Sequence, residues 1–482
     1  MNEKHVLNWD SPIERYFEEI SRIPRNSESE KEVSDYVAAF AKERGFEVYQ
    51  DEIWNVIVKK PASADRQGRA PVMLEGHLDM VCAKTAESGH DFTKDPIELC
   101  LEDGILTARG TTLGADDGFG VAYMLAILDD DSLSHPPLEC VFTVQEETDT
   151  VGACCLDKGK LASNRMIGLD GDRERETFVG CACSDRVVLK KCYELEPAVG
   201  TATQLKLDGF YTGNYQGIVH PECGNAIKMA ARLLRSLQDR KISYQICRWN
   251  GGELENMNPF DTRLVIALAE EDAAEAETAM RKEFETILEE FEDPRYNGDL
   301  TLNFGAEASK ALSREDSRRL AAMLHAMPNN MFQAGVLDKE MRVVNNIGTI
   351  CLEEGHCEVV MAGRAKQGSG ELELVRCCED VAAIADFDVI VEERYRSWPY
   401  NRDSKLRALA NRIAEEDYGF TFREEICPGG LEVAYFFEGK EDFDALQLGP
   451  DLEGLHTPDE KMDMASFHRM YDLVCRMLSE MA

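Results

Sequence analysis

The sequence predicts an α/β fold with a mostly parallel central sheet flanked by helices, interrupted by a second, α+β domain. Towards both ends of the chain, short apolar strand candidates alternate with helical stretches, which is typical of a parallel sheet. Between about residues 187 and 392 the pattern changes to half-exposed strands, long helices and a hairpin. We therefore expect one domain formed by residues 1–186 and 393–482, and an inserted domain formed by residues 187–392.

The first domain begins with a stretch that predicts helix up to Gly45. Its apolar residues recur at helical spacing, at Tyr16, Ile20, Val33, Tyr36, Val37 and Phe40. Several short apolar segments then predict buried strands: VIVKK (56–60), VMLEG (72–76), CVFTV (140–144), RMIGL (165–169) and, much later, DALQLG (444–449). The clearest helix among them is FGVAYMLAILDD (119–130).

The inserted segment combines strands and helices in a different order. TQLKLDGFY (203–211) alternates like a half-exposed strand, and RLVIALA (263–269) predicts another strand. A hairpin is expected in TICLEEGHCEVVMAG (349–363), around Glu354-Gly355. Three segments predict helices: GNAIKMAARLLRSL (224–237), EDAAEAETAMRKEFETILEEF (271–291) and ELELVRCCEDVAAIA (371–385).

The charge balance excludes two classes of partner. Against 53 Lys and Arg the chain has 91 Asp and Glu, a formal net charge of −38. Such a surface repels phosphate backbones and anionic membranes, so neither nucleic acid nor a membrane is an expected partner. The sequence has no apolar run of about 18 residues, and its start lacks the apolar core of a signal peptide. We therefore expect a cytoplasmic protein.

The 16 cysteines are scattered and predict no disulfide framework and no paired CxxC zinc site. Cys181-Ala-Cys183 could indicate metal binding, but small buried thiols are the favoured interpretation.

Residues 109–120, RGTTLGADDGFG, place two adjacent aspartates among four glycines. Taken alone, the stretch is slightly more typical of a surface turn, since Asp-Gly pairs are common turn formers. Neighbouring carboxylates repel each other, however, unless a cation or donor lies close by.

Polar side chains follow the predicted strands where each strand ends. His77 and Asp79 follow the second strand, Glu146 and Glu147 the third, and Asp170 the fourth, while His456 lies in the loop after the last strand. Ligands of open α/β sheets bind at the carboxyl ends of strands. So many carboxylates can share a partly buried site only if positive charge joins them. Two divalent metal ions would supply it, and the His/Asp/Glu set suits zinc, with cobalt or manganese as alternatives.

Each of these side chains has an expected role. Asp116 would bridge both metals with its two oxygens. Asp79 would orient the His77 ring, and Glu146 would serve as general base for a metal-activated water. The remaining ligands are His77 and Asp170 for the first metal, and Glu147 and His456 for the second.

The chain resembles the aminoacyl-histidine dipeptidases (Xaa-His dipeptidases), cytosolic dinuclear-zinc enzymes of the metallopeptidase family that includes aminoacylase and glutamate carboxypeptidase. The resemblance implies the metal roles given above, a catalytic zinc-peptidase domain with an inserted lid domain, and a homodimer. It also suggests a strained or cis peptide bond after Asp116. The stretches that carry it run from residue 20 to the C-terminus: KPASA, EGHLDMV, HDFTKDPIE, ARGTTLGADDG, QEETDTVGA, GLDGD, GCACSD, CGNA, NGGELEN, GGLE and GLHTPDE.

The resemblance also implies three substrate contacts. Arg364, in MAGRA, matches an arginine that would grip the terminal carboxylate of the substrate. Asn256, in GGELEN, matches a lid asparagine near the substrate. Glu432, in GGLE, lies where a carboxylate could meet the free amine of a dipeptide.

Several positions depart from the family pattern. Where these dipeptidases have a lid histidine that stabilises the oxyanion, this chain has Asn214, in TGNYQG. His220, in IVHPECGNA, could replace it if the loop shifts its register. Pro428 stands in place of a histidine, and Glu255 in place of a basic residue. These departures predict an altered substrate pocket and leave the requirement for histidine in the substrate open.

We therefore predict a metal-dependent hydrolase of the peptide bond of dipeptides. A related aminoacylase or carboxypeptidase acting on N-acyl amino acids is the alternative within the same chemistry. A catalytically silent homologue that binds metal or peptides is the alternative of another class, and Asn214 is the reason to consider it.

Overall fold

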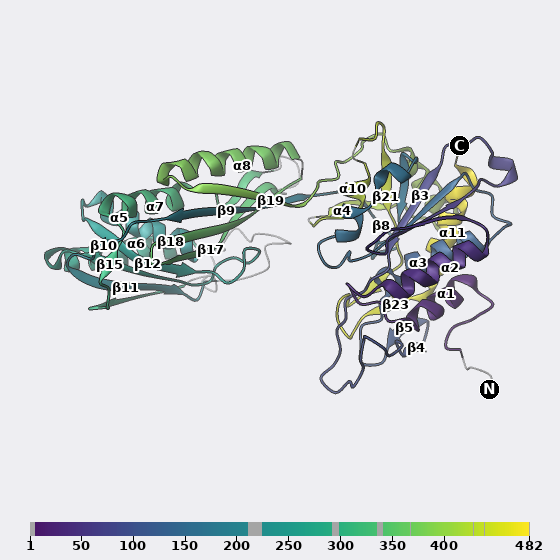
Figure 1. Cartoon of the computed structure of the whole chain (residues 1–482), viewed down its shortest axis with the longest axis horizontal. Coiled ribbons are helices and arrows are strands. Elements are labelled where there is room, and N and C mark those ends of the chain that lie inside the picture. Colours follow the sequence, from purple (N-terminus) through teal and green to yellow (C-terminus); the bar gives the residue numbers. More distant parts are fainter. Residues whose placement is uncertain are drawn as a thin grey trace. The chain divides into compact units, whose positions relative to one another are not determined.

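The structure is a computed structural model that divides into two compact units, each with its own hydrophobic core. The first unit consists of Met1–Cys181 and Trp398–Ala482, and the second of Ala182–Ser397 (Figure 1). The residues described are 5–210, 224–291, 298–334, 341–366, 368–427, 429–437 and 439–481. Asn214, His220 and Pro428 therefore lie outside the described residues.

The first unit contains the predicted α/β sheet. Its eight strands run in the order β1-β2-β6-β3-β7-β21-β8-β20, and the strands β6, β3, β7 and β21 at its centre are mutually parallel. Their bounds are β1 Glu47–Gln50, β2 Val56–Lys60, β3 Val72–His77, β6 Leu138–Thr143, β7 Arg165–Gly168, β8 Glu176–Cys181, β20 Arg423–Cys427 and β21 Asp444–Gln447. A small antiparallel sheet contains β4 Leu99–Glu102, β5 Ile105–Ala108, β22 Leu452–Glu453 and β23 Lys461–Asp463.

Helices flank this sheet. The long helix α3 contacts both β3 and α1, and nearly all of its side chains are buried, which is why its sequence is apolar on every face. The helices of the unit are α1 Pro12–Ser21, α2 Lys31–Glu43, α3 Ala115–Asp129, α4 Val151–Cys155, α9 Lys405–Tyr418, α10 Val433–Phe436 and α11 Met464–Glu480.

The first helical stretch differs from the prediction, because it forms two helices rather than one. Helix α1 ends at Ser21 and α2 begins only at Lys31. Pro24 lies between them, and a proline disfavours helical backbone at the residue before it. Both helices bury the predicted apolar residues, including Phe17 and Val37.

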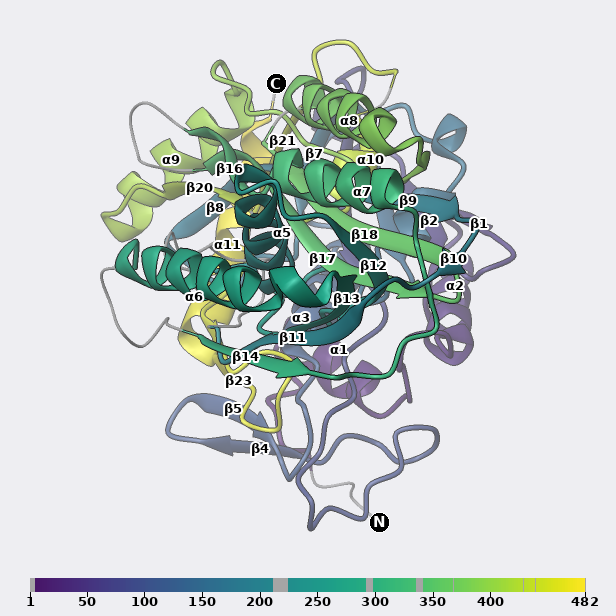
Figure 2. The same ribbon diagram turned by 90° about the vertical axis from the view of Figure 1, so that its left-hand side faces the viewer.

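The second unit is an antiparallel α+β structure. Its main sheet runs in the order β14-β11-β13-β12-β17-β18-β9-β19, with β16 paired to β17, and α5 to α8 lie on one face of it (Figure 2). The strands are β9 Cys183–Cys192, β11 Thr201–Asp208, β12 Tyr244–Gly251, β13 Thr262–Leu268, β14 Asp299–Phe304, β16 Asn330–Ala334, β17 Met341–Glu353, β18 His356–Ala365 and β19 Asp388–Tyr395. The helices are α5 Ala226–Asp239, α6 Ala273–Glu289, α7 Arg314–Ala326 and α8 Gly368–Ala382. A separate short pair contains β10 Glu196–Pro197 and β15 Lys310–Ala311.

Cys181 and Cys183 are buried and form no disulfide, as the interpretation of small buried thiols requires. Of the helices within the described ranges, none combines the length and the apolar character needed to cross a membrane.

Candidate metal centre

Three neighbouring parallel strands of the first unit end at the same edge of the sheet. Strand β3 lies between β6 and β7, and His77 at its end is opposite Thr143 at the end of β6. The polar residues that follow these strands are therefore brought together, as expected for the carboxyl ends of an open α/β sheet. They are His77 at the end of β3 and Asp79 after it, Glu146 and Glu147 after β6, and Asp170 after β7.

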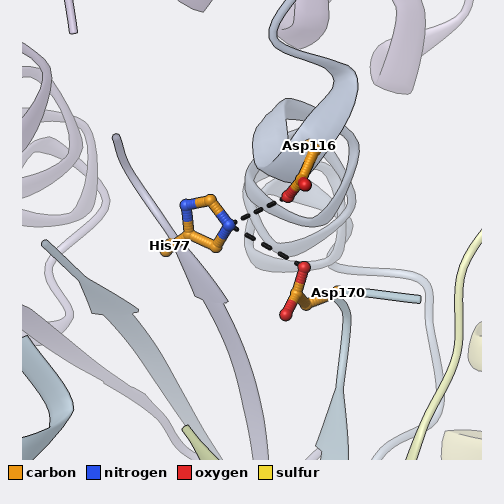
Figure 3. Close-up of side chains that lie close together, drawn as sticks. All are labelled: His77, Asp116 and Asp170. Atoms are coloured by element: carbon orange, nitrogen blue, oxygen red, sulfur yellow. Dashed lines mark hydrogen bonds and ion pairs between the residues drawn. The ribbon is translucent and has the colours of Figure 1, made fainter. Parts of the chain in front are cut away.

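A first cluster forms around the buried imidazole of His77. Its Nε2 lies 3.0 Å from Oδ1 of Asp116 and 3.8 Å from Oδ1 of Asp170 (Figure 3). The second oxygen of Asp170 accepts a hydrogen bond of 2.8 Å from Nε2 of Gln447, at the end of β21. Strand β21 thus orients Asp170 towards the end of β3.

A second cluster forms on the other oxygen of Asp116. Nε2 of His456 lies 3.3 Å from Oδ2 of Asp116 and 3.1 Å from Oε1 of Glu147. Oε1 of Glu147 is buried, and apart from this contact with His456 it has no hydrogen-bond partner among the described residues. The carboxylate of Asp116 therefore belongs to both clusters, with one oxygen facing each imidazole.

The backbone at Asp116 has an unusual form. The peptide bond between Asp116 and Asp117 is cis, as the resemblance suggests. Asp117 is fully buried; its Oδ2 accepts a bond of 3.0 Å from the backbone N of His77, and its Oδ1 one of 3.1 Å from that of Gly120. We did not predict this anchoring role, although the adjacent pair of aspartates was its signal in the sequence.

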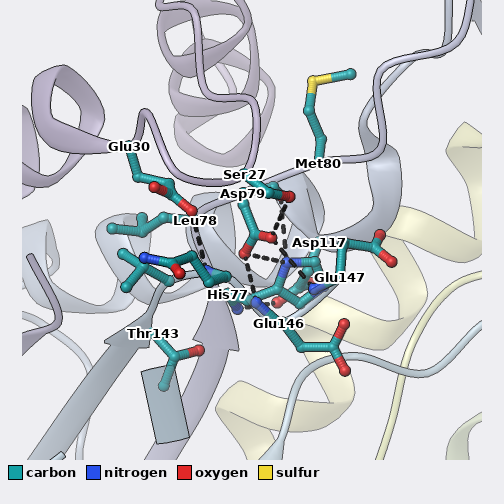
Figure 4. A network of polar contacts seen from close by, with 12 residues as sticks. Ser27, Glu30, His77, Leu78, Asp79, Met80, Asp117, Thr143, Glu146 and Glu147 are labelled. Atoms are coloured by element: carbon teal, nitrogen blue, oxygen red, sulfur yellow. Dashed lines mark hydrogen bonds and ion pairs between the residues drawn. The ribbon is translucent and has the colours of Figure 1, made fainter. Parts of the chain in front are cut away.

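Asp79 contacts both of the neighbouring segments. Its Oδ1 lies 3.4 Å from Nδ1 of His77 and accepts a bond of 3.0 Å from the backbone N of Glu146. Its Oδ2 accepts bonds from the backbone N of Glu147, at 3.2 Å, and from Oγ of Ser27, at 2.8 Å (Figure 4). One carboxylate thus orients the His77 ring and fixes the backbone of the Glu146-Glu147 pair.

Like charges dominate the electrostatics of the two clusters. Burial, together with the charges of Asp116 and Glu147, raises the pKa of Asp170 to about 7. Burial opposes the charged form of His77, yet its carboxylate neighbours raise the pKa of this imidazole well above its ordinary value. Hydrogen bonding to Asp116 and Glu147 raises the pKa of His456 to about 10. The carboxylates therefore favour positive charge between them.

The same groups fit divalent cations. Candidate ligand atoms lie within 4.8 Å of one another in three sets: His77, Asp116 and Asp170; Asp116, Glu147 and His456; and His77, Glu146 and Glu147. Imidazole nitrogens and carboxylate oxygens are ligands of zinc, and they also suit manganese and cobalt. The buried Oε1 of Glu147 contacts the His456 imidazole but no other described donor, and a buried carboxylate oxygen is costly unless its charge is balanced.

Glu146 lies beside these groups and has the properties of a proton carrier. Its backbone is held by Asp79, whereas burial raises the pKa of its side chain well above the ordinary value of a glutamate. A raised pKa makes the carboxylate of Glu146 a stronger base than an ordinary glutamate.

Glu432 lies deeper than the sequence suggested. Only 2% of it is exposed; Oε2 accepts a bond of 2.5 Å from Oγ1 of Thr143, and Oε1 one of 3.3 Å from the backbone N of Ala153. It is also hydrogen-bonded to the buried Glu75, and burial raises the pKa of Glu75 to about 8 and that of Glu432 well above its ordinary value. A substrate amine could reach Glu432 only if this side chain gave up some of these bonds.

Arg364 and Asn256 belong to the second unit. Arg364 lies near the end of β18, buried and opposite Ser184 of β9. Asn256 lies in the loop between β12 and β13. The carbonyls on either side of it, those of Glu255 and Met257, accept bonds of 3.0 and 2.8 Å from Nδ2 of Asn346.

A family model matches residues 73–480, which include all the candidate ligands. This chain belongs to peptidase family M20/M25/M40. Members of this family are peptidases, so the charged edge of the first unit is the candidate active site of a hydrolase of peptide bonds.

Two relatives resemble the chain along its whole length. The cytosol non-specific dipeptidase of Escherichia coli (strain K12) is 30% identical over 478 residues, which cover 97% of each chain. The aminoacylhistidine dipeptidase of Vibrio alginolyticus, a solved structure, superposes with a TM-score of 0.89 at 28% identity, covering 100% of this chain and 99% of that one. The aminopeptidase PepT of Bacillus cereus, with a TM-score of 0.52 and 18% identity over 99% and 100% of the two chains, shares the fold.

Proposed function

We propose that this M20 peptidase hydrolyses the peptide bond of dipeptides with the help of two divalent cations. The observation that carries the proposal is the placement of Asp116, whose two oxygens face two different histidines. His77, Asp116 and Asp170 would hold one cation, and Asp116, Glu147 and His456 the other. The two relatives that align over the whole chain are both dipeptidases by name, which supports this substrate class.

The chemistry divides between the cations and the side chains. When bound, the cations polarise the carbonyl oxygen of the substrate and lower the pKa of water. Glu146 takes a proton from the water that attacks the carbonyl carbon. As the carbon–nitrogen bond breaks, Glu146 passes this proton to the leaving amine. Asp79 keeps the His77 ring and the backbone of Glu146 in place throughout. Zinc is the cation we propose first, with cobalt and manganese as alternatives.

The family resemblance supports three substrate contacts. We propose that Arg364 binds the terminal carboxylate of the dipeptide and that Asn256 contacts its backbone. Glu432 would interact with its free amine. The oxyanion would be stabilised by Asn214 or His220, which lie outside the described residues. The first unit would then be the catalytic domain and the second a lid and dimerisation domain of a cytoplasmic homodimer.

The experiment is a panel of free and N-acetylated dipeptides, with and without histidine as the second residue, assayed with zinc, cobalt or manganese. We expect hydrolysis of free dipeptides and little hydrolysis of acetylated ones. Equal rates on both sets would instead assign the chain to the aminoacylase or carboxypeptidase type. If no member is hydrolysed while metal is demonstrably bound, the chain is a silent homologue, the alternative that Asn214 motivates.

A further inference from the structure

Glu460 is a buried carboxylate that touches the loop of Asp116 but none of the proposed ligand atoms. Only 2% of it is exposed, and it follows His456 by four residues. Its two oxygens accept hydrogen bonds from four consecutive backbone N–H groups. Oε2 accepts from Leu113 at 2.8 Å and Gly114 at 3.0 Å, and Oε1 from Ala115 at 2.8 Å and Asp116 at 3.4 Å.

Arg25 binds the same loop through a backbone carbonyl oxygen. Its guanidinium is buried; Nη1 donates to the carbonyl oxygens of Leu78 at 3.0 Å and Asp79 at 2.9 Å, and Nη2 donates to that of Gly114. Arg25 therefore connects the segment that follows His77 with the loop that precedes Asp116. Nothing in the sequence around Arg25 indicates this role.

The glycine at position 114 is explained by these contacts. Gly114 has a φ of +68°, and a Cβ atom there would lie 2.6 Å from Nη2 of Arg25 and 2.8 Å from Sδ of Met80. A side chain at this position would strain the backbone and displace the guanidinium. The stretch RGTTLGADDGFG therefore forms a loop that leads into α3, held by the buried side chains of Arg25 and Glu460, and not a free surface turn.

We propose that Glu460 is a positioning residue which, together with Arg25, sets the carboxylate of Asp116 where both cations can share it. This inference rests on the proposed function, because it concerns the same pair of cations. Glu460 and Arg25 link the segments that carry His77, Asp116 and His456, so they fix the spacing between the two clusters. Partners that orient metal ligands in this way typically change metal affinity about 10–100-fold when they are replaced.

The test is Glu460→Gln. Glutamine keeps the shape of the side chain, but its amide NH₂ must face two of the four N–H donors, so the loop can no longer be held as before. We expect wild-type protein to bind two Co²⁺ ions in a titration followed by visible absorption. The variant should bind one of them about 10–100-fold more weakly, with a changed absorption spectrum. Its activity should be low at limiting Co²⁺ and recover in part at excess Co²⁺.

The matched control is Asp459→Asn, which removes the neighbouring exposed charge and leaves the clamp intact. It should bind Co²⁺ as the wild type does. If Glu460→Gln does not fold, Arg25→Lys tests the other side of the clamp, because a lysine cannot reach all three carbonyls; its Co²⁺ affinity should fall similarly.

Two outcomes would overturn the inference, and they are distinguishable. Unchanged Co²⁺ affinity and spectrum in the folded variant would refute the clamp while leaving the proposed function intact. A wild-type protein that binds no Co²⁺ would refute the proposed function, and the clamp with it.

Discussion

The two units of the chain bury different sets of polar groups. Near the strand ends of the first unit several buried groups are carboxyl groups, among them Glu75, Asp117 and Glu432. In the second unit, within its described ranges, the buried polar side chains are hydroxyls and amides, apart from Asp185 and Arg364.

Asn225 is the centre of an amide network in the second unit. Nδ2 of Asn225 donates to Oδ1 of Asn329 at 3.1 Å, to Oδ1 of Asn346 at 3.3 Å and to the carbonyl of Ile347 at 2.9 Å. A neutral network of this kind is complete without an ion. In the first unit the carboxylates of Asp116, Glu147 and Asp170 lie close together, and they repel one another unless positive charge is added. The candidate clusters for a cation, among the described residues, all lie in the first unit.

The largest effect is expected at the proton carrier. Glu146→Gln should lower kcat about 10²–10⁴-fold, because the amide cannot accept a proton from water. Cation binding should be retained, since the ligand sets that include Asp116 do not need Glu146. Kinetics on a hydrolysed dipeptide and metal analysis of the same sample check both parts. Glu87→Gln, at an exposed position, is the control. Retained kcat in Glu146→Gln would exclude this residue as the base.

Removal of the cations should lower the stability of the first unit and leave that of the second unit unchanged. A bound ligand at about 1,000 times its Kd stabilises the folded state by about 4 kcal/mol. Chelation should therefore speed hydrogen exchange in β3 and α3 and leave β17 and β18 of the second unit unchanged. Hydrogen exchange followed by mass spectrometry, with and without chelator, measures this. Equal changes in both units would contradict the contrast drawn above.

The buried pair of Glu75 and Glu432 makes the stability of the folded protein fall as the pH rises. The folded-state pKa of Glu75 is raised to about 8 from an ordinary 4.5, so the folded state holds a proton that the unfolded state releases. Stability is therefore lost as the pH rises from about 4.5 to 8. Glu75→Gln removes this loss, so its stability relative to wild type should rise across that window by up to about 2–4 kcal/mol. Urea unfolding at pH 5 and pH 8 tests it; a difference independent of pH would refute the assignment.

The smallest effect is expected in the second unit, at Asn346. Asn346→Ala leaves the carbonyls of Glu255 and Met257 without their donor and should cost about 1–3 kcal/mol of stability. Because Asn256 lies between them, KM should rise several-fold while Co²⁺ binding stays unchanged. Urea unfolding and steady-state kinetics check this, with the exposed Asn303→Ala as control. Weaker Co²⁺ binding in Asn346→Ala would contradict the expectation that cation binding depends on the first unit alone.

The sequence predicted those parts of the site that follow from a local pattern. Apolar segments followed by polar residues indicated the strand ends. The structure brings together the residues expected there, together with Asp116 and His456: His77, Asp116, Glu147, Asp170 and His456. Their role as ligands stays a prediction. The break between α1 and α2 was missed because the apolar residues before and after Pro24 each recur at helical spacing, so that the two runs look like one helix.

By itself the sequence determined the fold class and the candidate ligands, because side-chain periodicity and strand ends are properties of short segments. Only the tertiary structure decided which groups surround them. Arg25 and Glu460 reach the loop of Asp116 from opposite ends of the chain, and Glu432 is paired with Glu75 in the interior. Such contacts depend on how distant segments pack, and no spacing along the chain encodes them.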